Sequence, residues 1–309
     1  MNKMKAVICT KYGAPEVLKI MEVEKPTPKD NEVLIKIMAS AVNFGDTRVR
    51  RLDEKGILGM VMPFVLGFGK PRKSVLGSSF SGVVAQTGKN VKDFNIGDEV
   101  MGLTGWKMGA YAEYITLSDK SMMTKKPANA TIEEAAAIPF GAHTAIYFLG
   151  KAKIQEKTNP KVLIYGATGS VGAAAIQIAK YYNAHVTAVC SEAGTNLVKE
   201  LGVDEIIFYD KKDFTKRDKK YDIVFDAVGK TSKKQCTPLL NNNSRYVTVA
   251  GLSPAQERVE QLELLRTLFE NGKYKATIDK VYSMDEIVEA HRYVDSGRKK
   301  GNVVIKIAE

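Results

Sequence analysis

The residues best suited to chemistry lie in a glycine-rich run at 162–172, VLIYGATGSVG. An apolar strand followed by a tight turn and a helix start is the setting that a dinucleotide-binding loop requires. An ordinary strand-to-helix turn is the alternative, and the fingerprint is imperfect because its first glycine is replaced by alanine. We predict that this loop holds the pyrophosphate of a cofactor through Ala167, Thr168, Gly169, Ser170, Val171 and Gly172.

The end of the next strand, HVTAVCS at 185–191, bears on which nicotinamide cofactor would bind. Asp or Glu at this place holds the ribose 2′-hydroxyl of NADH and repels the additional phosphate of NADPH. Here the strand ends on Ser191, whose hydroxyl can donate to a phosphate, and Glu192 follows and can point either way. The residues therefore favour NADPH over NADH. Ser191 as a cap of the following helix is compatible with the same choice.

Cysteine and histidine are too scattered to suggest a metal centre. The chain contains Cys9, Cys190, Cys236, His143, His185 and His291. Unpaired cysteines indicate a reducing, cytoplasmic setting, and a zinc site needs several such ligands to converge. We predict no metal, and we expect His143 on a helix beside the cofactor and His291 on the polar face of the last helix.

The elements that must position these residues fall into different patterns along the chain. Short alternating strands between turn residues predict a β-rich domain over 1–125. Apolar strands alternating with helices predict a parallel sheet covered on both faces over 126–256, and Thr131 with Glu134 forms a capping box ahead of its first helix. The remaining segment, 257–309, is predicted to form helices at 259–270 and 284–296 and a last strand, and to return to the β-rich domain.

Composition narrows the class of protein further. The chain has 309 residues, 44% of them hydrophobic, which excludes a disordered chain and allows about two domains. The formal net charge of +11 would suit a polyanion, but both signs are mixed along the chain. We find no secretion signal or transmembrane stretch and expect no membrane partner.

Seven segments together resemble the zinc-free quinone oxidoreductase branch of the medium-chain dehydrogenase/reductase superfamily. They are residues 41–50, 75–102, 109–117, 133–149, 162–180, 221–229 and 278–307. The resemblance implies an α/β fold class, with a GroES-like β-rich catalytic domain and a Rossmann parallel-sheet cofactor domain. Zinc-dependent members carry Gly-His-Glu where this chain has Gly77-Ser78-Ser79.

Without a metal to polarise a carbonyl, hydride addition to a conjugated system needs only hydrogen-bond donors at its delocalised oxygen. We therefore expect a zinc-independent oxidoreductase that transfers hydride from NADPH to a quinone or an α,β-unsaturated carbonyl (enone). The resemblance implies that Asn43 orients the substrate oxygen and that Asp46 fixes its loop rather than moving protons. Arg48 stands where the family often has tyrosine, so solvent can serve as the proton donor.

The resemblance also implies further cofactor contacts, each of which has a plain packing role as its alternative. Thr144 would touch the nicotinamide ring and Asn302 would lie near the phosphates. The other positions are Asp226, Ala227, Val228, Ala250 and Gly251.

A different class of function is a non-enzymatic NADPH-sensing or RNA-binding protein on the same fold. Basic clusters at 211–212, 217–220, 233–234 and 298–300 would form its surface, but the aromatic residues near them suit a core, so nucleic acid is not an expected partner. Only residues 252–258 separate Gly251 from the next helix, where resembling proteins build the strand of a dimer seam. We predict a monomer or an atypical homodimer.

Overall fold

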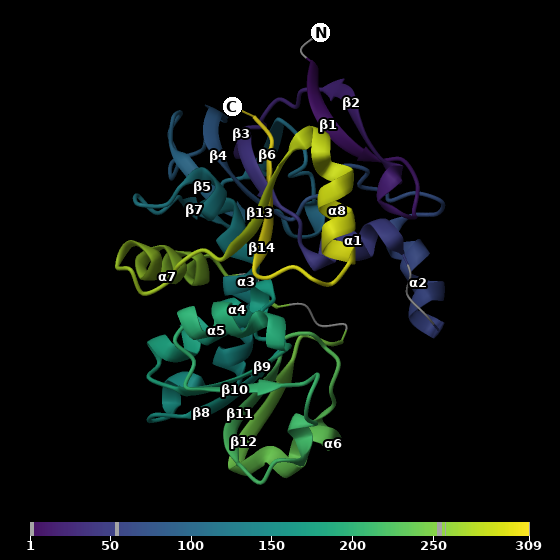
Figure 1. The fold of residues 1–309 in the computed structure, drawn as a ribbon. Coiled ribbons are helices and arrows are strands. Elements are labelled where there is room, and N and C mark those ends of the chain that lie inside the picture. Colours follow the sequence, from purple (N-terminus) through teal and green to yellow (C-terminus); the bar gives the residue numbers. More distant parts are fainter. Residues whose placement is uncertain (1–2, 53–55, 252–254, 257, 309) are drawn as a thin grey trace. The chain divides into compact units, whose positions relative to one another are not determined.

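The computed structural model describes residues 3–308 except 53–55, 252–254 and 257 (Figure 1). The chain forms two compact units, unit 1 from Met1–Pro139 with Ile278–Glu309, and unit 2 from Phe140–Thr277. The division falls inside helix α3 (Ile132–Lys151), later than the change in sequence texture at residue 126. Within the described ranges, no helix is long and apolar enough to cross a bilayer.

A seven-stranded sheet forms the frame of unit 1, in the order β13-β14-β3-β4-β5-β7 with β6 also paired to β3. A separate pair, β1 and β2, is antiparallel. The last strand, β14, pairs with β3, so the C-terminal segment joins the sheet that strands from the first half of the chain build. The strands are β1 (Lys3–Cys9), β2 (Leu18–Glu24), β3 (Glu32–Ala41), β4 (Ser79–Thr87), β5 (Glu99–Leu103), β6 (Tyr114–Ser118), β7 (Met123–Lys125), β13 (Ile278–Ser283) and β14 (Asn302–Lys306).

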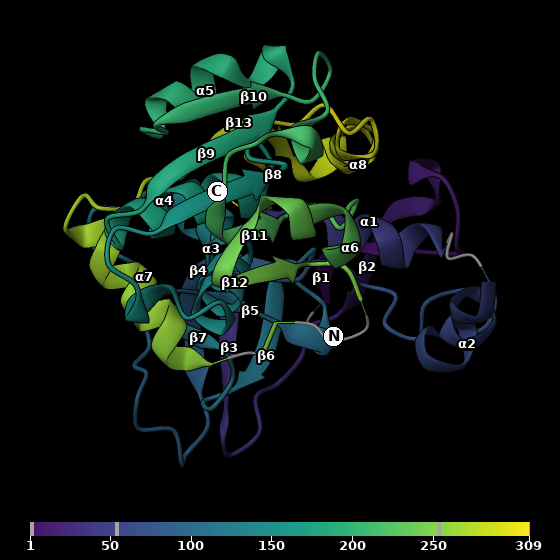
Figure 2. The ribbon, with the colours of Figure 1, turned by 90° about the horizontal axis from the view of Figure 1, so that it is seen from below.

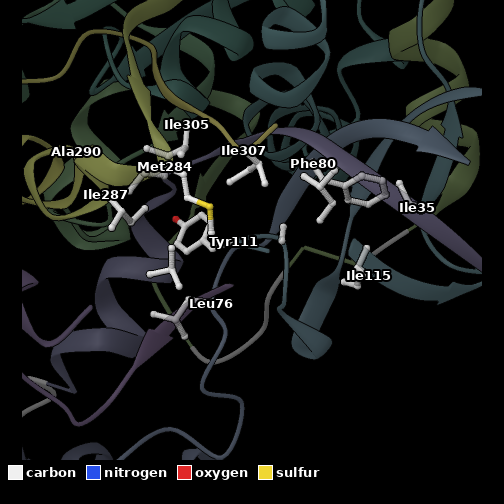
Figure 3. Packing of buried hydrophobic residues seen from close by; sticks show 14 of the residues in the cluster. Ile35, Leu76, Phe80, Tyr111, Ile115, Met284, Ile287, Ala290, Ile305 and Ile307 are labelled. Carbon is white, nitrogen blue, oxygen red and sulfur yellow. The ribbon is translucent and has the colours of Figure 1, made fainter. Parts of the chain in front are cut away.

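The core of unit 1 lies between these strands and helix α8 (Ile287–Asp295). Figure 3 shows Tyr111 within this core together with Leu76, Met284 and Ile287. Burying such side chains stabilises the fold by about 1.5–3 kcal/mol each. Two more helices, α1 (Phe44–Arg51) and α2 (Gly56–Leu66), follow β3.

Unit 2 contains a fully parallel five-stranded sheet in the order β10-β9-β8-β11-β12, seen from below in Figure 2. The alternation of apolar strands and helices predicted this arrangement, and the α/β fold class is confirmed. Its elements are β8 (Lys161–Tyr165), α4 (Ser170–Tyr181), β9 (His185–Cys190), α5 (Thr195–Glu200), β10 (Glu205–Phe208), β11 (Tyr221–Asp226), α6 (Lys233–Cys236), β12 (Leu240–Thr248) and α7 (Val259–Glu270).

Helix α7 groups with unit 2, whereas its place in the sequence predicts that it belongs to the segment returning to the β-rich domain. The Gln261 side chain of α7 contacts His143 in unit 2, and α7 buries Leu262, Leu265 and Phe269. Within 252–258, on which the assembly prediction rests, residues 252–254 and 257 lie outside the described part of the chain. The predicted oligomeric state therefore stays a prediction.

Candidate active site

The glycine-rich loop lies at the carboxyl end of β8, where ligands bind in sheets of this kind. The amides of Gly166 and Ala167 donate to the carbonyl of Val189, which ties the loop to the neighbouring strand. Helix α4 then begins at Ser170 with Gly169 as its N-cap, and its first helical bond runs from the Ala173 amide to the Gly169 carbonyl. The helix therefore directs the amides that precede Ala173, and the positive end of its dipole, toward the loop.

Two glycines beside this loop have different reasons to be glycine. A Cβ on Gly172 would lie 2.1 Å from the carbonyl oxygen of Gly166, so only glycine lets α4 pack this closely on β8. A Cβ on Gly169 would meet nothing closer than the same oxygen at 3.6 Å. The space over Gly169 is therefore open, as a pyrophosphate approaching the backbone would require.

Further predicted residues gather at the same edge of the sheet. Val228 lies over Gly166, since a Cβ there would be 2.7 Å from a Val228 methyl, and Thr168 contacts Gly194 in the loop after β9. The Ala227 amide donates to the Tyr165 carbonyl. The ends of β8, β9 and β11 therefore meet around the glycine-rich loop.

Asp226 lies in this group, but its carboxylate is hydrogen-bonded to backbone amides of the turn that follows it. Its carboxylate accepts from the amides of Val228 at 3.0 Å, Gly229 at 2.8 Å and Thr231 at 2.7 Å. The side chain therefore shapes the turn after β11 and leaves cofactor contact to the backbone around Val228. Ala250 adjoins this turn beside Gly229, and both Ala250 and Gly251 are exposed.

Helix α3 also reaches the loop, because a Cβ on Gly141 would be 2.6 Å from the Ser170 carbonyl oxygen. Thr144, one turn further along α3, is 9% exposed and its hydroxyl donates to the Phe140 carbonyl. His143 lies 2.6 Å from Gln261 between Nδ1 and Oε1, and burial lowers the pKa of this histidine. Thr144 thus lies one helical turn from the contact between α3 and Ser170, while His143 joins α3 to α7.

The ends of β9 and β10 form the place where a 2′-phosphate would be recognised. Phe208 pairs with Cys190 across the two strands, so Ser191 and the residues after Phe208 are neighbours. Lys211 Nζ lies 2.6 Å from Glu192 Oε1, and both side chains are more than half exposed. Such a surface pair contributes only about 0–1 kcal/mol, which leaves Lys211 able to exchange its partner.

Unit 1 holds the predicted catalytic residues, starting with Asn43 at the beginning of α1. Its Nδ2 donates to the hydroxyls of Ser78 and Ser79, at 3.1 Å each. Its Oδ1 is buried without a partner in the described part of the chain. Both amide hydrogens are thus engaged, and a substrate oxygen, which accepts hydrogen bonds, would need another donor.

Asp46 lies one helical turn from Asn43 and is fully buried. One carboxylate oxygen accepts from the Asn43 amide at 2.9 Å and from the Tyr111 hydroxyl at 3.1 Å. Burial raises the pKa of Asp46 to about 6, against the lowering effect of these donors. The hydrogen bond from the Asn43 backbone amide agrees with the expected loop-fixing role of Asp46. Because Asp46 is 0% exposed, its carboxylate has no direct contact with solvent protons.

His291 does not lie on a polar helix face, so that expectation was wrong. The side chain is 0% exposed, its ring packs edge-on against Tyr111, and neither ring nitrogen has a partner among the residues described. Burial first, and the charge of Arg50 second, lower the pKa of His291 to about 3, so the ring stays neutral. Helical spacing from Ile287 to Val294 places His291 on the apolar face, and that signal could have found it.

For Asn302 and Arg48 the structure gives the location and burial of the side chain, and their expected roles stay predictions. Asn302 is buried at the start of β14 in unit 1, and Arg48 is exposed on α1. Ser79 and Tyr111 are site residues that motif reasoning missed. Ser79 was noted only as part of a lost zinc motif, and Tyr111 sits in an ordinary strand-like run.

Neither a metal centre nor a strong basic surface stands out in the mapped portions of the chain. No group of three or more His, Cys, Asp or Glu side chains is arranged to hold a metal ion there. In the basic cluster at 217–220, Arg217 and Lys219 both pair with Glu205 at 2.6 Å. These ion pairs offset part of the positive charge that an RNA-binding protein would need on this surface.

Comparisons with known proteins agree with this arrangement. Two family models match, the alcohol dehydrogenase GroES-like domain over residues 29–128 and the zinc-binding dehydrogenase over residues 170–281. The chain is 35% identical to 2-methylene-furan-3-one reductase of Solanum lycopersicum, covering 98% of this chain and 79% of that protein. It is 30% identical to the chloroplastic NADPH-dependent alkenal/one oxidoreductase of Arabidopsis thaliana, over 98% and 80%. The solved quinone oxidoreductase from Coxiella burnetii matches with a TM-score of 0.86 at 28% identity, over 99% and 100%.

Proposed function

The chain belongs to the medium-chain dehydrogenase/reductase family, and we propose that it reduces quinones or α,β-unsaturated carbonyls with NADPH. Similarity to a quinone oxidoreductase and to an alkenal/one oxidoreductase indicates the substrate class. For an enone, hydride adds to the β-carbon and a proton from solvent adds to the α-carbon. The products are the saturated carbonyl and NADP⁺, so atoms and electrons balance.

The nicotinamide ring supplies the hydride when bound. The residues that would hold the cofactor are the glycine-rich loop for the pyrophosphate and Thr144 on α3 for the ring. The fit rests on the open space over Gly169 and on the amides that α4 directs toward it. These features belong to unit 2 alone.

The substrate oxygen would receive its hydrogen bond from Ser78 rather than directly from Asn43. The Ser78 hydroxyl accepts from Asn43 Nδ2 at 3.1 Å and lies near enough to the Asp46 carboxyl to donate to it, so a substrate oxygen would take over the Ser78 proton from Asp46. A hydroxyl that already accepts a hydrogen bond donates a stronger one. This pair is the observation that carries the proposal, because it supplies the donor that a delocalised oxyanion needs.

Two exposed aromatic side chains favour a flat acceptor. Phe44, next to Asn43, is 58% exposed, and Trp106 is 66% exposed. Trp106 follows Thr104, whose amide donates to the Ser78 carbonyl at 3.0 Å. Both rings thus come from segments that adjoin the Asn43–Ser78 pair, and aromatic faces bind conjugated rings by offset stacking.

The preference for NADPH is part of the proposal and rests on the ends of β9 and β10. Ser191 offers a hydroxyl where an acidic residue would repel the 2′-phosphate, and Lys211 can turn from Glu192 to that phosphate.

A panel assay tests the function as a whole. We expect oxidation of NADPH with 1,4-benzoquinone, 9,10-phenanthrenequinone or 2-alkenals. Absence of turnover with the entire panel, together with RNA binding that weakens steeply with salt, would favour the non-enzymatic alternative.

A further inference from the structure

Helix α2 is composed entirely of apolar residues, GILGMVMPFVL over Gly56–Leu66. An apolar run of this length in a helix is typical of a buried core helix or of a segment that lies in a membrane interface. At about 1.5 Å per residue it spans roughly half of the ~30 Å hydrocarbon layer, so it is too short to cross. Whether the side chains of α2 are buried or exposed therefore distinguishes a core helix from a membrane-interface segment.

Four described side chains of α2 and the turn after it are exposed, while Met62, Pro63 and Leu66 are half-buried. Phe64 is 65% exposed, Val65 55%, Val61 48% and Phe68 66%. The rings of Phe64 and Phe68 lie 5.0 Å apart, edge to face, and together these four side chains form the α2 apolar patch. Figures 1 and 2 both show α2 at the outer edge of unit 1, beyond α1, with no sheet against it. The described part of the helix therefore presents large apolar side chains to solvent, which a core helix would bury.

The charges next to the patch are of one sign. Residues 55–92 contain no Asp or Glu, and Lys70, Arg72 and Lys73 follow the patch as exposed side chains. Hydrogen bonds from Tyr12 to Gly67 and Gly69 bring the N-terminal segment, with exposed Lys11, to the same place. Across the resolved chain segments, none of these basic side chains forms an ion pair. The patch thus has a cationic rim.

We propose that the α2 apolar patch and its cationic rim dock on an anionic lipid surface. Phe and Val side chains would enter the boundary between headgroups and acyl chains, while the rim contacts acidic headgroups. A second copy of this chain fits less well, because a twofold contact would bring the same cationic rims together. This inference replaces the expectation of no membrane partner and is independent of the proposed reaction.

Vesicle sedimentation tests the proposal with the full chain. We expect binding to phosphatidylcholine vesicles that contain phosphatidylglycerol, weaker binding without it, and release by high salt. The Phe64→Ser/Phe68→Ser variant should lower the partition coefficient by about tenfold or more, because each ring contributes apolar burial. The Lys70→Gln/Lys73→Gln variant should lower it roughly fivefold per charge removed.

Matched variants elsewhere keep the test specific. Ile96→Ser removes a 68% exposed apolar side chain from a turn between β4 and β5, and Lys233→Gln/Lys234→Gln removes two exposed lysines from unit 2. Both should bind vesicles as the natural chain does, and circular dichroism checks that every variant is folded. The proposal is overturned if the natural chain ignores anionic vesicles, or if the matched variants lose as much binding as the α2 variants. Light scattering that shows a dimer abolished by Phe64→Ser/Phe68→Ser, without vesicle binding, would assign the patch to a second copy instead.

Discussion

At the scale of single residues, the account depends on the pair formed by Asn43 and Ser78. We expect Ser78→Ala and Asn43→Ala each to lower kcat/KM for an enone by about 100-fold, the usual effect of losing one oxyanion donor. The double variant should cost little more than either single change, because the two side chains act as one donor chain. The affinity for NADPH, measured by titration, should stay the same.

Ser81 offers a matched control for this prediction. It lies on β4, which begins directly after Ser78, is buried, and donates its hydroxyl to the Ile132 carbonyl at 2.6 Å. Ser81→Ala should reduce stability but leave kcat/KM unchanged. Equal losses of kcat/KM in Ser81→Ala and Ser78→Ala would show that the Ser78 effect is structural.

Asp46 predicts a pH-dependent difference in stability. Its pKa is about 6 in the folded chain, above the unfolded value of about 3.9. Below about pH 4 both states are protonated, and the folded state loses stability as pH rises through 6 because a buried charge forms. Relative to Asp46→Asn, the natural chain should therefore lose about 2–3 kcal/mol of unfolding free energy between about pH 4 and pH 7.

Urea unfolding of both proteins across this range measures the difference. Asp98→Asn is a control of opposite sign, because the Asn95 amide lowers the pKa of Asp98 and the natural chain should gain stability relative to that variant as pH rises. Parallel curves for the natural chain and Asp46→Asn would contradict the account of this carboxyl group.

The structural roles of some residues could be predicted from the sequence, and those of others could not. The glycine-rich loop and the Thr131–Glu134 capping box are local patterns, and the capping box is present with bonds of 2.9 and 3.2 Å. Contacts such as Tyr111 with Asp46 join residues 65 positions apart, and no local pattern encodes them. His291 was misjudged because residue type was weighed above helical spacing.

At the scale of elements, substitutions in the turn from β8 to α4 should affect stability and cofactor binding separately. Gly169→Val should fold with an unchanged melting temperature, since the space over Gly169 is open and its φ of −76° suits valine. The same side chain should occupy the pyrophosphate position and raise the Kd for NADPH by at least about tenfold. Normal cofactor binding by this variant would mean that the loop has another role.

Gly172→Ala is the matched change with the opposite outcome. Its Cβ would lie 2.1 Å from the Gly166 carbonyl oxygen, so we expect a loss of roughly 1–3 kcal/mol in unfolding free energy. Calorimetry of both variants beside NADPH titrations distinguishes the two roles.

The strand ends after β9 and β10 predict the choice of cofactor. Lys211→Ala should raise the Kd for NADPH about tenfold and leave the Kd for NADH unchanged, because only NADPH carries the 2′-phosphate. Ser191→Asp should weaken NADPH binding in the same way. Lys216→Ala is the control, since Lys216 is 82% exposed and pairs with Asp213 at 3.8 Å. A tenfold preference of the natural chain for NADH would refute this assignment.

Regular elements were predicted well where periodicity is strong. The helix expected at 259–270 is α7 with the same bounds. Helix α2 was not anticipated, because a uniformly apolar run has no periodicity to identify it. Tertiary grouping was also beyond the sequence, as the inclusion of α7 in unit 2 shows.

At the scale of the whole molecule, the two units carry separate parts of one proposed reaction. Unit 2 presents the glycine-rich loop and the strand ends where we propose that NADPH is selected, and unit 1 presents the Asn43–Ser78 pair. The sequence resemblance predicts the same division between a catalytic and a cofactor domain. It could not supply the donor chain, which depends on how the strand at 79–87 lies beside the start of α1.

Transfer of deuterium from NADPH labelled at C4 to a 2-alkenal tests the central claim most directly. We expect mass spectrometry and NMR of the product to show the label on the β-carbon, with the α-hydrogen taken from solvent, and we expect Ser78→Ala to slow this transfer by about 100-fold. Product without deuterium at the β-carbon, or no reduction of alkenals and quinones alike, would contradict the account.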